Sequence, residues 1–95
     1  TITEVEVLLK STAASRFFPK NNRETINKKC LSIASLVRVY IGEEKKNLTQ
    51  AEIADLQIFE RNAKTLASRM LVEKSADTLI PVVQALSEEF EDLFH

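Results

Sequence analysis

Apolar residues recur every three or four positions along most of the chain, the spacing of one face of an α-helix. The clearest run spans residues 50–73. Its apolar face is formed by Leu56, Phe59, Ala63, Leu66 and Met70. Three more runs span residues 4–17, 23–41 and 79–94. Because the connections between these runs are short, consecutive helices should be antiparallel. The pattern predicts an all-α fold, a compact antiparallel bundle of three or four helices.

Two capping pairs predict where helices begin. Thr49 with Glu52, and Thr3 with Glu6, have the spacing of a capping box, in which each residue's side chain bonds the other's backbone N–H. The first and third helices should therefore start just after Thr3 and Thr49.

Single residues predict the other helix ends. Asn22 is the expected cap of the second helix, and Asp77 or Thr78 that of the fourth. Pro19 should end the first helix, since the residue before a proline is pushed out of the helical region. Gly42, the single glycine, suits the left-handed position that would end the second helix.

Two short stretches also fit β-strands. Residues 2–7 alternate between apolar and polar side chains, and the stretch 37–41 contains the β-branched residues Val37, Val39 and Ile41. A short strand in either place remains an alternative to helix.

The second and fourth runs contain large apolar residues outside their main faces. Those expected to bind a partner are Leu31, Leu36, Val39, Ile80 and Phe94. Two explanations stay open: the second helix is central in a monomer, or the leftover residues form an interface with another chain, such as a second copy.

Charge is distributed unevenly, although the net charge of the 95 residues is −1. Residues 1–46 contain nine Lys/Arg and five Asp/Glu, whereas residues 47–95 contain four and nine. The basic stretch consists of Lys10, Arg16, Lys20, Arg23, Lys28 and Lys29. The acidic face of the last helix consists of Glu88, Glu89, Glu91 and Asp92.

These charges allow several interpretations. The basic stretch could contact phosphates, and Phe17 and Phe18 within it could stack on bases. The pI near 5.8 favours instead solvated cations around core aromatic residues. The basic and acidic clusters could also approach each other, within one bundle or across a homodimer.

The sequence contains few residues that could support catalysis. His95 is the single histidine and Cys30 the single cysteine, so neither a Ser/His/Asp set nor a zinc site with several Cys and His ligands can be assembled. Cys30 lies on an apolar face, where a buried, inert thiol is expected. We expect no enzyme activity, no metal and no cofactor.

Length and hydropathy set the remaining expectations. Residues 1–95 should form a single helical domain. Without an apolar run of about 18 residues or a signal-peptide pattern, no membrane association and a cytoplasmic location are expected. The expected function is that of a small non-enzymatic regulatory protein that binds another protein through helical surfaces, possibly as a homodimer. The alternative is a nucleic-acid-binding regulator that uses residues 10–29.

Overall fold

The computed structural model describes residues 2–14 and 20–94, which form four α-helices and two 3-10 turns. In chain order the elements are α1 (Ile2–Ala14), α2 (Lys20–Glu44), η1 (Lys45–Asn47), α3 (Gln50–Val72), η2 (Ala76–Thr78) and α4 (Ile80–Phe94). The predicted all-α fold is confirmed. The strand alternatives are wrong, because residues 2–7 lie in α1 and residues 37–41 lie in α2.

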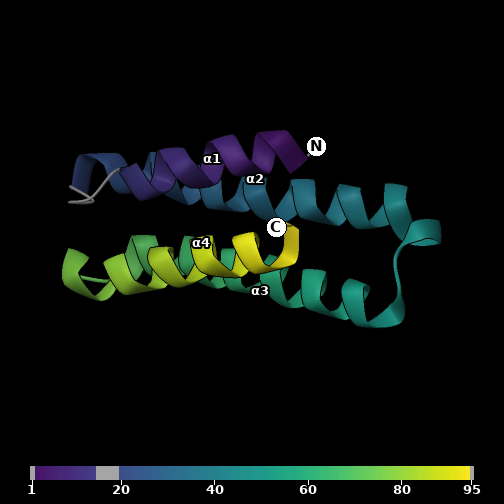
Figure 1. Cartoon of the computed structure of the whole chain (residues 1–95). Helices are drawn as coiled ribbons and strands as arrows, with labels where there is room; N and C mark the ends of the chain where they lie inside the picture. Colours follow the sequence, from purple (N-terminus) through teal and green to yellow (C-terminus); the bar gives the residue numbers. More distant parts are fainter. Residues whose placement is uncertain (1, 15–19, 95) are drawn as a thin grey trace.

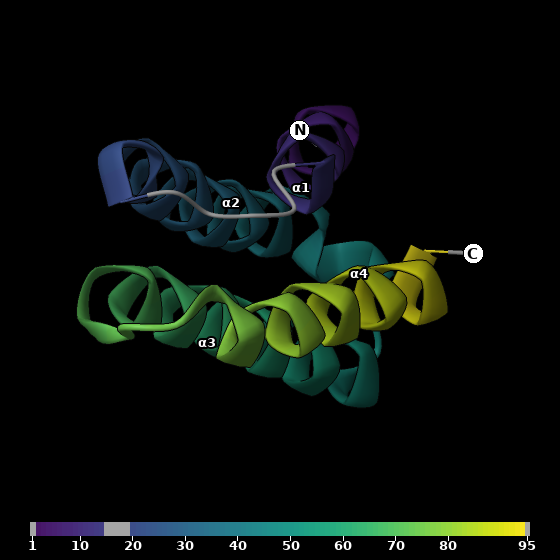
Figure 2. The ribbon, with the colours of Figure 1, turned by 90° about the vertical axis from the view of Figure 1, so that its left-hand side faces the viewer.

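The four helices form an antiparallel bundle (Figure 1). Each helix packs against the next along the chain, and α1 also packs against α4. The helices α2 and α3 have 25 and 23 residues, whereas α1 and α4 have 13 and 15. The α2–α3 hairpin therefore extends beyond the two short helices (Figure 1). Seen along the bundle, α1 lies beside α2 and α4 lies beside α3 (Figure 2). No helix in the described part of the chain combines the length and apolarity that a membrane span requires.

All four helices contribute to one apolar core. Its largest fully buried apolar side chains are Phe59, Phe90, Ile26, Ile33, Leu66, Met70, Leu79, Val5 and Val37. Burying one such side chain contributes about 1.5–3 kcal/mol relative to leaving it exposed. Aromatic rings join three helices, since Phe90 packs against Phe59 and Phe94, and Phe94 lies edge-on to Tyr40 at 5.7 Å.

The predicted capping box at the start of α3 is confirmed. The Thr49 hydroxyl accepts a hydrogen bond from the Glu52 N–H at 3.1 Å, and the Glu52 carboxylate accepts one from the Thr49 N–H at 3.0 Å. These bonds satisfy backbone donors that have no partner within the helix.

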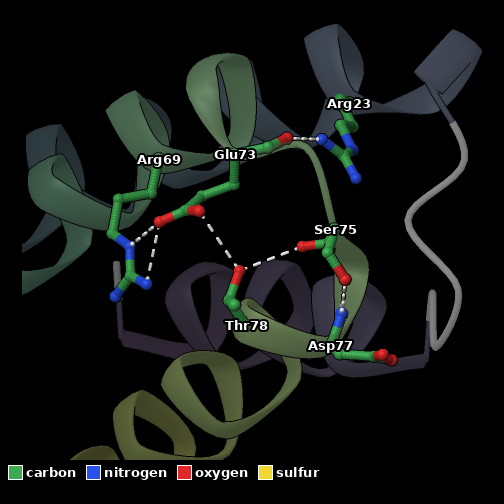
Figure 3. Close-up of polar contacts among 6 residues, drawn as sticks. All are labelled: Arg23, Arg69, Glu73, Ser75, Asp77 and Thr78. Atoms are coloured by element: carbon green, nitrogen blue, oxygen red, sulfur yellow. Dashed lines mark hydrogen bonds and ion pairs between the residues drawn. The ribbon is translucent and has the colours of Figure 1, made fainter.

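The end of α3 is held by two arginines (Figure 3). The guanidinium of Arg23, on α2, donates to the backbone carbonyl of Glu73, the residue that follows α3. Arg69 donates to the Glu73 carboxylate at 3.0 Å. Cations here are favourable because unpaired carbonyls give a helix C-terminus a partial negative charge.

The connection to α4 differs from the prediction. Neither Asp77 nor Thr78 caps α4, because both lie in η2 and Leu79 stands between them and the helix. The Ser75 hydroxyl instead accepts from the Asp77 N–H at 3.2 Å (Figure 3). The first α4 turn is closed by a 3.0 Å bond from the Val83 N–H to the Leu79 carbonyl.

Two other predicted helix starts are also wrong. α1 begins at Ile2, so Thr3 lies inside it, and Glu6 pairs with Lys10 at 3.0 Å. α2 begins at Lys20, before Asn22. A side-chain cap stabilises a helix by only about 1 kcal/mol, so tertiary packing can override it. The predicted end of α1 beyond Ala14, including Pro19, lies outside the described residues.

Gly42 does not end α2. The helix continues to Glu44, and η1 follows. The chain becomes extended only at Leu48, immediately before the Thr49 cap. Gly42 is thus an interior helical residue, and a Cβ atom added to it would meet nothing within 4 Å.

The capping box predicts that Thr49→Ala lowers the free energy of unfolding by about 1 kcal/mol, measured by urea denaturation. Thr49→Ser, which keeps the hydroxyl, should retain most of the stability. The hydrogen bonds from Thr49, backbone first, lower the pKa of Glu52. A lowered pKa in the folded state stabilises the fold above the unfolded pKa, about 4.3. Both proteins should therefore lose stability as the pH falls below that value. Because Thr49→Ala keeps the backbone N–H and removes only the hydroxyl, the difference between them should shrink only slightly.

The helical conformation of Gly42 predicts that Gly42→Ala raises the free energy of unfolding by about 0.5–1 kcal/mol, because glycine is a poor helix former. The matched control is Ala54→Gly at an exposed position inside α3, which should lower it by a similar amount. Loss of stability in Gly42→Ala would contradict the helical assignment of this residue.

Candidate functional site

An open groove of about 660 Å³ lies on the outer side of the α2–α3 hairpin. From α2 and η1 it is lined by Arg38, Ile41, Gly42 and Lys45. From α3 it is lined by Ile53, Gln57, Glu60, Arg61 and Lys64. The helices α1 and α4 contribute no lining residue, so the bundle's own core does not fill this groove.

Helical spacing brings the cations of the groove together. Arg38 and Lys45 are seven residues apart, as are Gln57 and Lys64, and residues seven apart share one side of a helix. The antiparallel register is marked by the Asn27 side-chain amide, which donates to the Ala67 carbonyl at 2.6 Å. The two stripes therefore run along opposite walls of one groove.

The groove is electrostatically positive. Four cations and one carboxylate line it, and that carboxylate, Glu60, lies 3.2 Å from the Lys64 amine. Arg38, Lys45 and Arg61 have no ion-pair partner among the residues that the structure describes. Clustered cations of this kind attract anionic groups and speed their association.

The floor of the groove is partly apolar. Ile41 and Ile53 are half-buried there, and Gly42 exposes backbone in place of a side chain. The open space beside Gly42 allows a ligand to approach the helix closely. A ligand of this groove would thus meet both cationic and apolar contacts.

The described cations of the predicted basic stretch have polar partners within the bundle. Lys10 pairs with Glu6, and Lys28 lies 3.9 Å from Glu24. Lys29 donates to the Ser11 hydroxyl of α1 at 2.6 Å.

Two more positions of the stretch have other roles or are not described. Arg23 is only 8% exposed and caps α3, as described above. Arg16 and the side chain of Lys20 lie outside the described part, as do Phe17 and Phe18. Among the described cations of residues 10–29, Arg23 and Lys29 thus contribute to capping and helix pairing, whereas Lys10 and Lys28 form ion pairs within their own helices.

The acidic residues of α4 point in different directions. The Glu89 carboxylate accepts from the Asn62 side chain of α3 at 2.9 Å. The hydrogen bond and charge of Glu6 raise the pKa of Lys10, and the charge of Glu91 adds to this effect. Glu88 and Asp92 are exposed. No group of three metal-ligating side chains occurs among the described residues.

The predicted partner-binding residues separate into two groups. Leu31 and Val39, on the outside of α2, are 46% and 50% exposed. Leu36, Ile80 and Phe94 are half-buried and pack against the core. Three of the five thus contribute to the bundle itself, and two remain on its surface.

The groove cations Arg38, Lys45, Arg61 and Lys64 were not among the predicted site residues. They escape a search for charge clusters because they are spread over 27 positions of the chain. The seven-residue spacing from Arg38 to Lys45, away from the apolar face of α2, is the signal that could have identified them.

Cys30 is fully buried in the core, as the sequence predicts. Burial raises the pKa of its thiol to about 11, because the apolar surroundings disfavour the thiolate. The thiolate is the reactive form of cysteine, so this residue is poorly suited to nucleophilic chemistry.

We predict that Cys30 reacts with a thiol reagent such as Ellman's reagent only when the bundle opens, and rapidly in denaturant. Since the pKa is raised in the folded state, stability is highest below the pKa of an unfolded thiol. It should fall as the pH rises from about 8.5 toward about 11. Cys30→Ala should lack this part of the pH dependence. Fast labelling of the native protein at neutral pH would contradict the buried position.

Comparisons with models of protein families, with curated proteins and with solved structures found no match to this chain.

Proposed function

We propose that this protein is a non-enzymatic interaction module that binds another protein through the groove between α2 and α3. The observation that carries the proposal is the set of four cations around an apolar floor, on a side of the hairpin that α1 and α4 leave uncovered. Protein-binding surfaces commonly combine an apolar centre with a polar rim, and arginine is enriched in them.

The composition of the chain supports an interaction role over catalysis. The single cysteine is buried with a raised pKa, and the single histidine is residue 95. A regulatory role and a homodimeric state belong to the same proposal, with Val39 as an exposed apolar contact on α2 that does not line the groove.

The nucleic-acid alternative is less well supported. The described cations of residues 10–29 are engaged with side chains or carbonyls of the bundle. The groove cations are too few and too mixed with apolar residues to form the continuous basic stripe that tracks a phosphate backbone.

The proposal predicts that the double charge reversal Arg38→Glu/Arg61→Glu strongly reduces capture of the protein's partner from cells. Against that partner in purified form, Kd should rise about tenfold, since exposed ion pairs contribute about 0.2–1 kcal/mol each and reversal replaces attraction with repulsion. The measurement is affinity capture with mass spectrometry, followed by calorimetry on the purified pair.

The matched control is Lys10→Glu/Lys74→Glu, which makes the same charge change at exposed positions outside the groove. It should leave binding within about twofold of the wild type at physiological salt, where distant surface charges are screened. Equal loss in both double variants, or capture of nucleic acid alone, would contradict the proposed function.

A further inference from the structure

The binding face extends beyond the groove along the whole α2–α3 hairpin. Leu31 is seven residues before Arg38, and Leu71 is seven residues after Lys64, so each leucine continues a stripe of groove cations. Leu31 is 46% exposed and Leu71 is 59% exposed. We call the surface formed by these two stripes the outer face.

The outer face has an apolar half and a cationic half. The Asn27–Ala67 hydrogen bond marks one level of the hairpin. Because α2 and α3 are antiparallel, Leu71 lies about one turn from this level toward η2, whereas Leu31 lies about one turn toward η1, level with Lys64. Arg38 and Lys45 lie 11 and 18 residues after Asn27, toward η1. A ligand aligned with the hairpin would meet Leu71 at one end, Leu31 and Lys64 in the middle, and Arg38 and Lys45 toward the other end.

An α-helix is the shape that fits this face. Two adjacent antiparallel helices leave a groove between them, into which the side-chain ridges of a third helix can pack at an axis distance of 8–10 Å. Leu31 and Lys45 are 14 residues apart, which corresponds to about 21 Å along α2 and to about four turns of a bound helix. The missing side chain at Gly42 permits close approach within this span.

The charges select a carboxylate-bearing ligand. Arginine and lysine bind carboxylates through charge-assisted hydrogen bonds, and Arg38 and Arg61 lack ion-pair partners within the described residues. A nucleic-acid strand carries a phosphate about every 3.4 Å and would place several against the leucines and Glu60. A second copy of the chain is the competing occupant, because on its α1 the 61% exposed Val7 lies one turn from the exposed Glu4, and sedimentation distinguishes it from a partner helix.

We propose that the outer face binds an amphipathic helix of a partner protein, an inference that rests on the proposed function. That helix has carboxylates at one end, opposite Arg38 and Arg61, and large apolar side chains at the other, opposite Leu31 and Leu71. The cations give orientation and association rate, and the apolar half adds buried area.

The test uses the full chain and a labelled 16-residue helical peptide, based on alanine, with glutamates on one face of its first half and leucines on the same face of its second half. A matched peptide has glutamine in place of each glutamate. Binding is measured by fluorescence anisotropy at low and high salt. We expect saturable binding of the acidic peptide, with the glutamine peptide and the Arg38→Glu/Arg61→Glu protein each about tenfold weaker.

The apolar half is tested by Leu31→Ser/Leu71→Ser, which should weaken binding of the acidic peptide by at least fivefold, with only a small change in its salt dependence. Lys10→Glu, at an exposed position of α1 outside the outer face, is the control and should bind like the wild type. Circular dichroism checks that each variant is folded. Because all four substituted side chains of the outer face are exposed or line an open groove, the variants should retain the helical bundle.

Three results would overturn the inference. One is equal affinity for the glutamate and glutamine peptides. Another is tighter binding of a single-stranded oligonucleotide than of the acidic peptide, which would assign the face to nucleic acid. The third is a dimer in sedimentation that Arg38→Glu/Arg61→Glu dissociates, which would assign the face to a second copy. If the acidic peptide fails to bind while the same double variant still loses its cellular partner, the proposed function stands and the helical acidic occupant is wrong.

Discussion

The packing of α2 along α3 is the contact on which the rest of the structure depends. Small residues allow the two helices to approach closely: Ala34, two turns after Asn27 on the same face, is buried, as are Ala63 and Ala67. The Asn27 amide donates to the carbonyl of Ala67, and Arg23 holds the end of α3. These polar bonds have specific partners, so they define one register of the hairpin, whereas apolar packing alone would tolerate several.

The unequal helix lengths follow from this hairpin and produce its two different sides. With only 13 and 15 residues, α1 and α4 cover the inner side of α2 and α3 and bury the apolar faces of all four helices there. The outer side receives no such cover. Residues on the outer side can therefore be selected for binding without a cost to the core. Gly42 weakens an isolated helix, but it is tolerated on this side because core packing stabilises α2.

Charge follows the same division into layers. α1 and α4 contain one lysine and six carboxylates, whereas residues 20–72, which include α2 and α3, contain ten Lys/Arg and six Asp/Glu. Lys10, the lysine of α1, contacts Glu6, and the charge of Glu91 on α4 also raises its pKa. The carboxylates of α1 and α4 therefore offset the charge of Lys10. The positive excess stays with the hairpin, where part of it lines the groove. An anionic ligand is therefore attracted to the outer side.

By itself, the sequence determined the helical elements, because local apolar periodicity and the Thr49–Glu52 cap are properties of adjacent residues. It also determined the burial of Cys30, which shares its apolar face with Ile26 and Ile33. Only the tertiary structure decided the helix ends near Asn22 and Gly42, since packing outweighs caps of about 1 kcal/mol. The groove, too, was decided only by the tertiary structure. Arg38 and Lys64 are 26 residues apart in the sequence, and only the antiparallel register of α2 and α3 brings them to one groove.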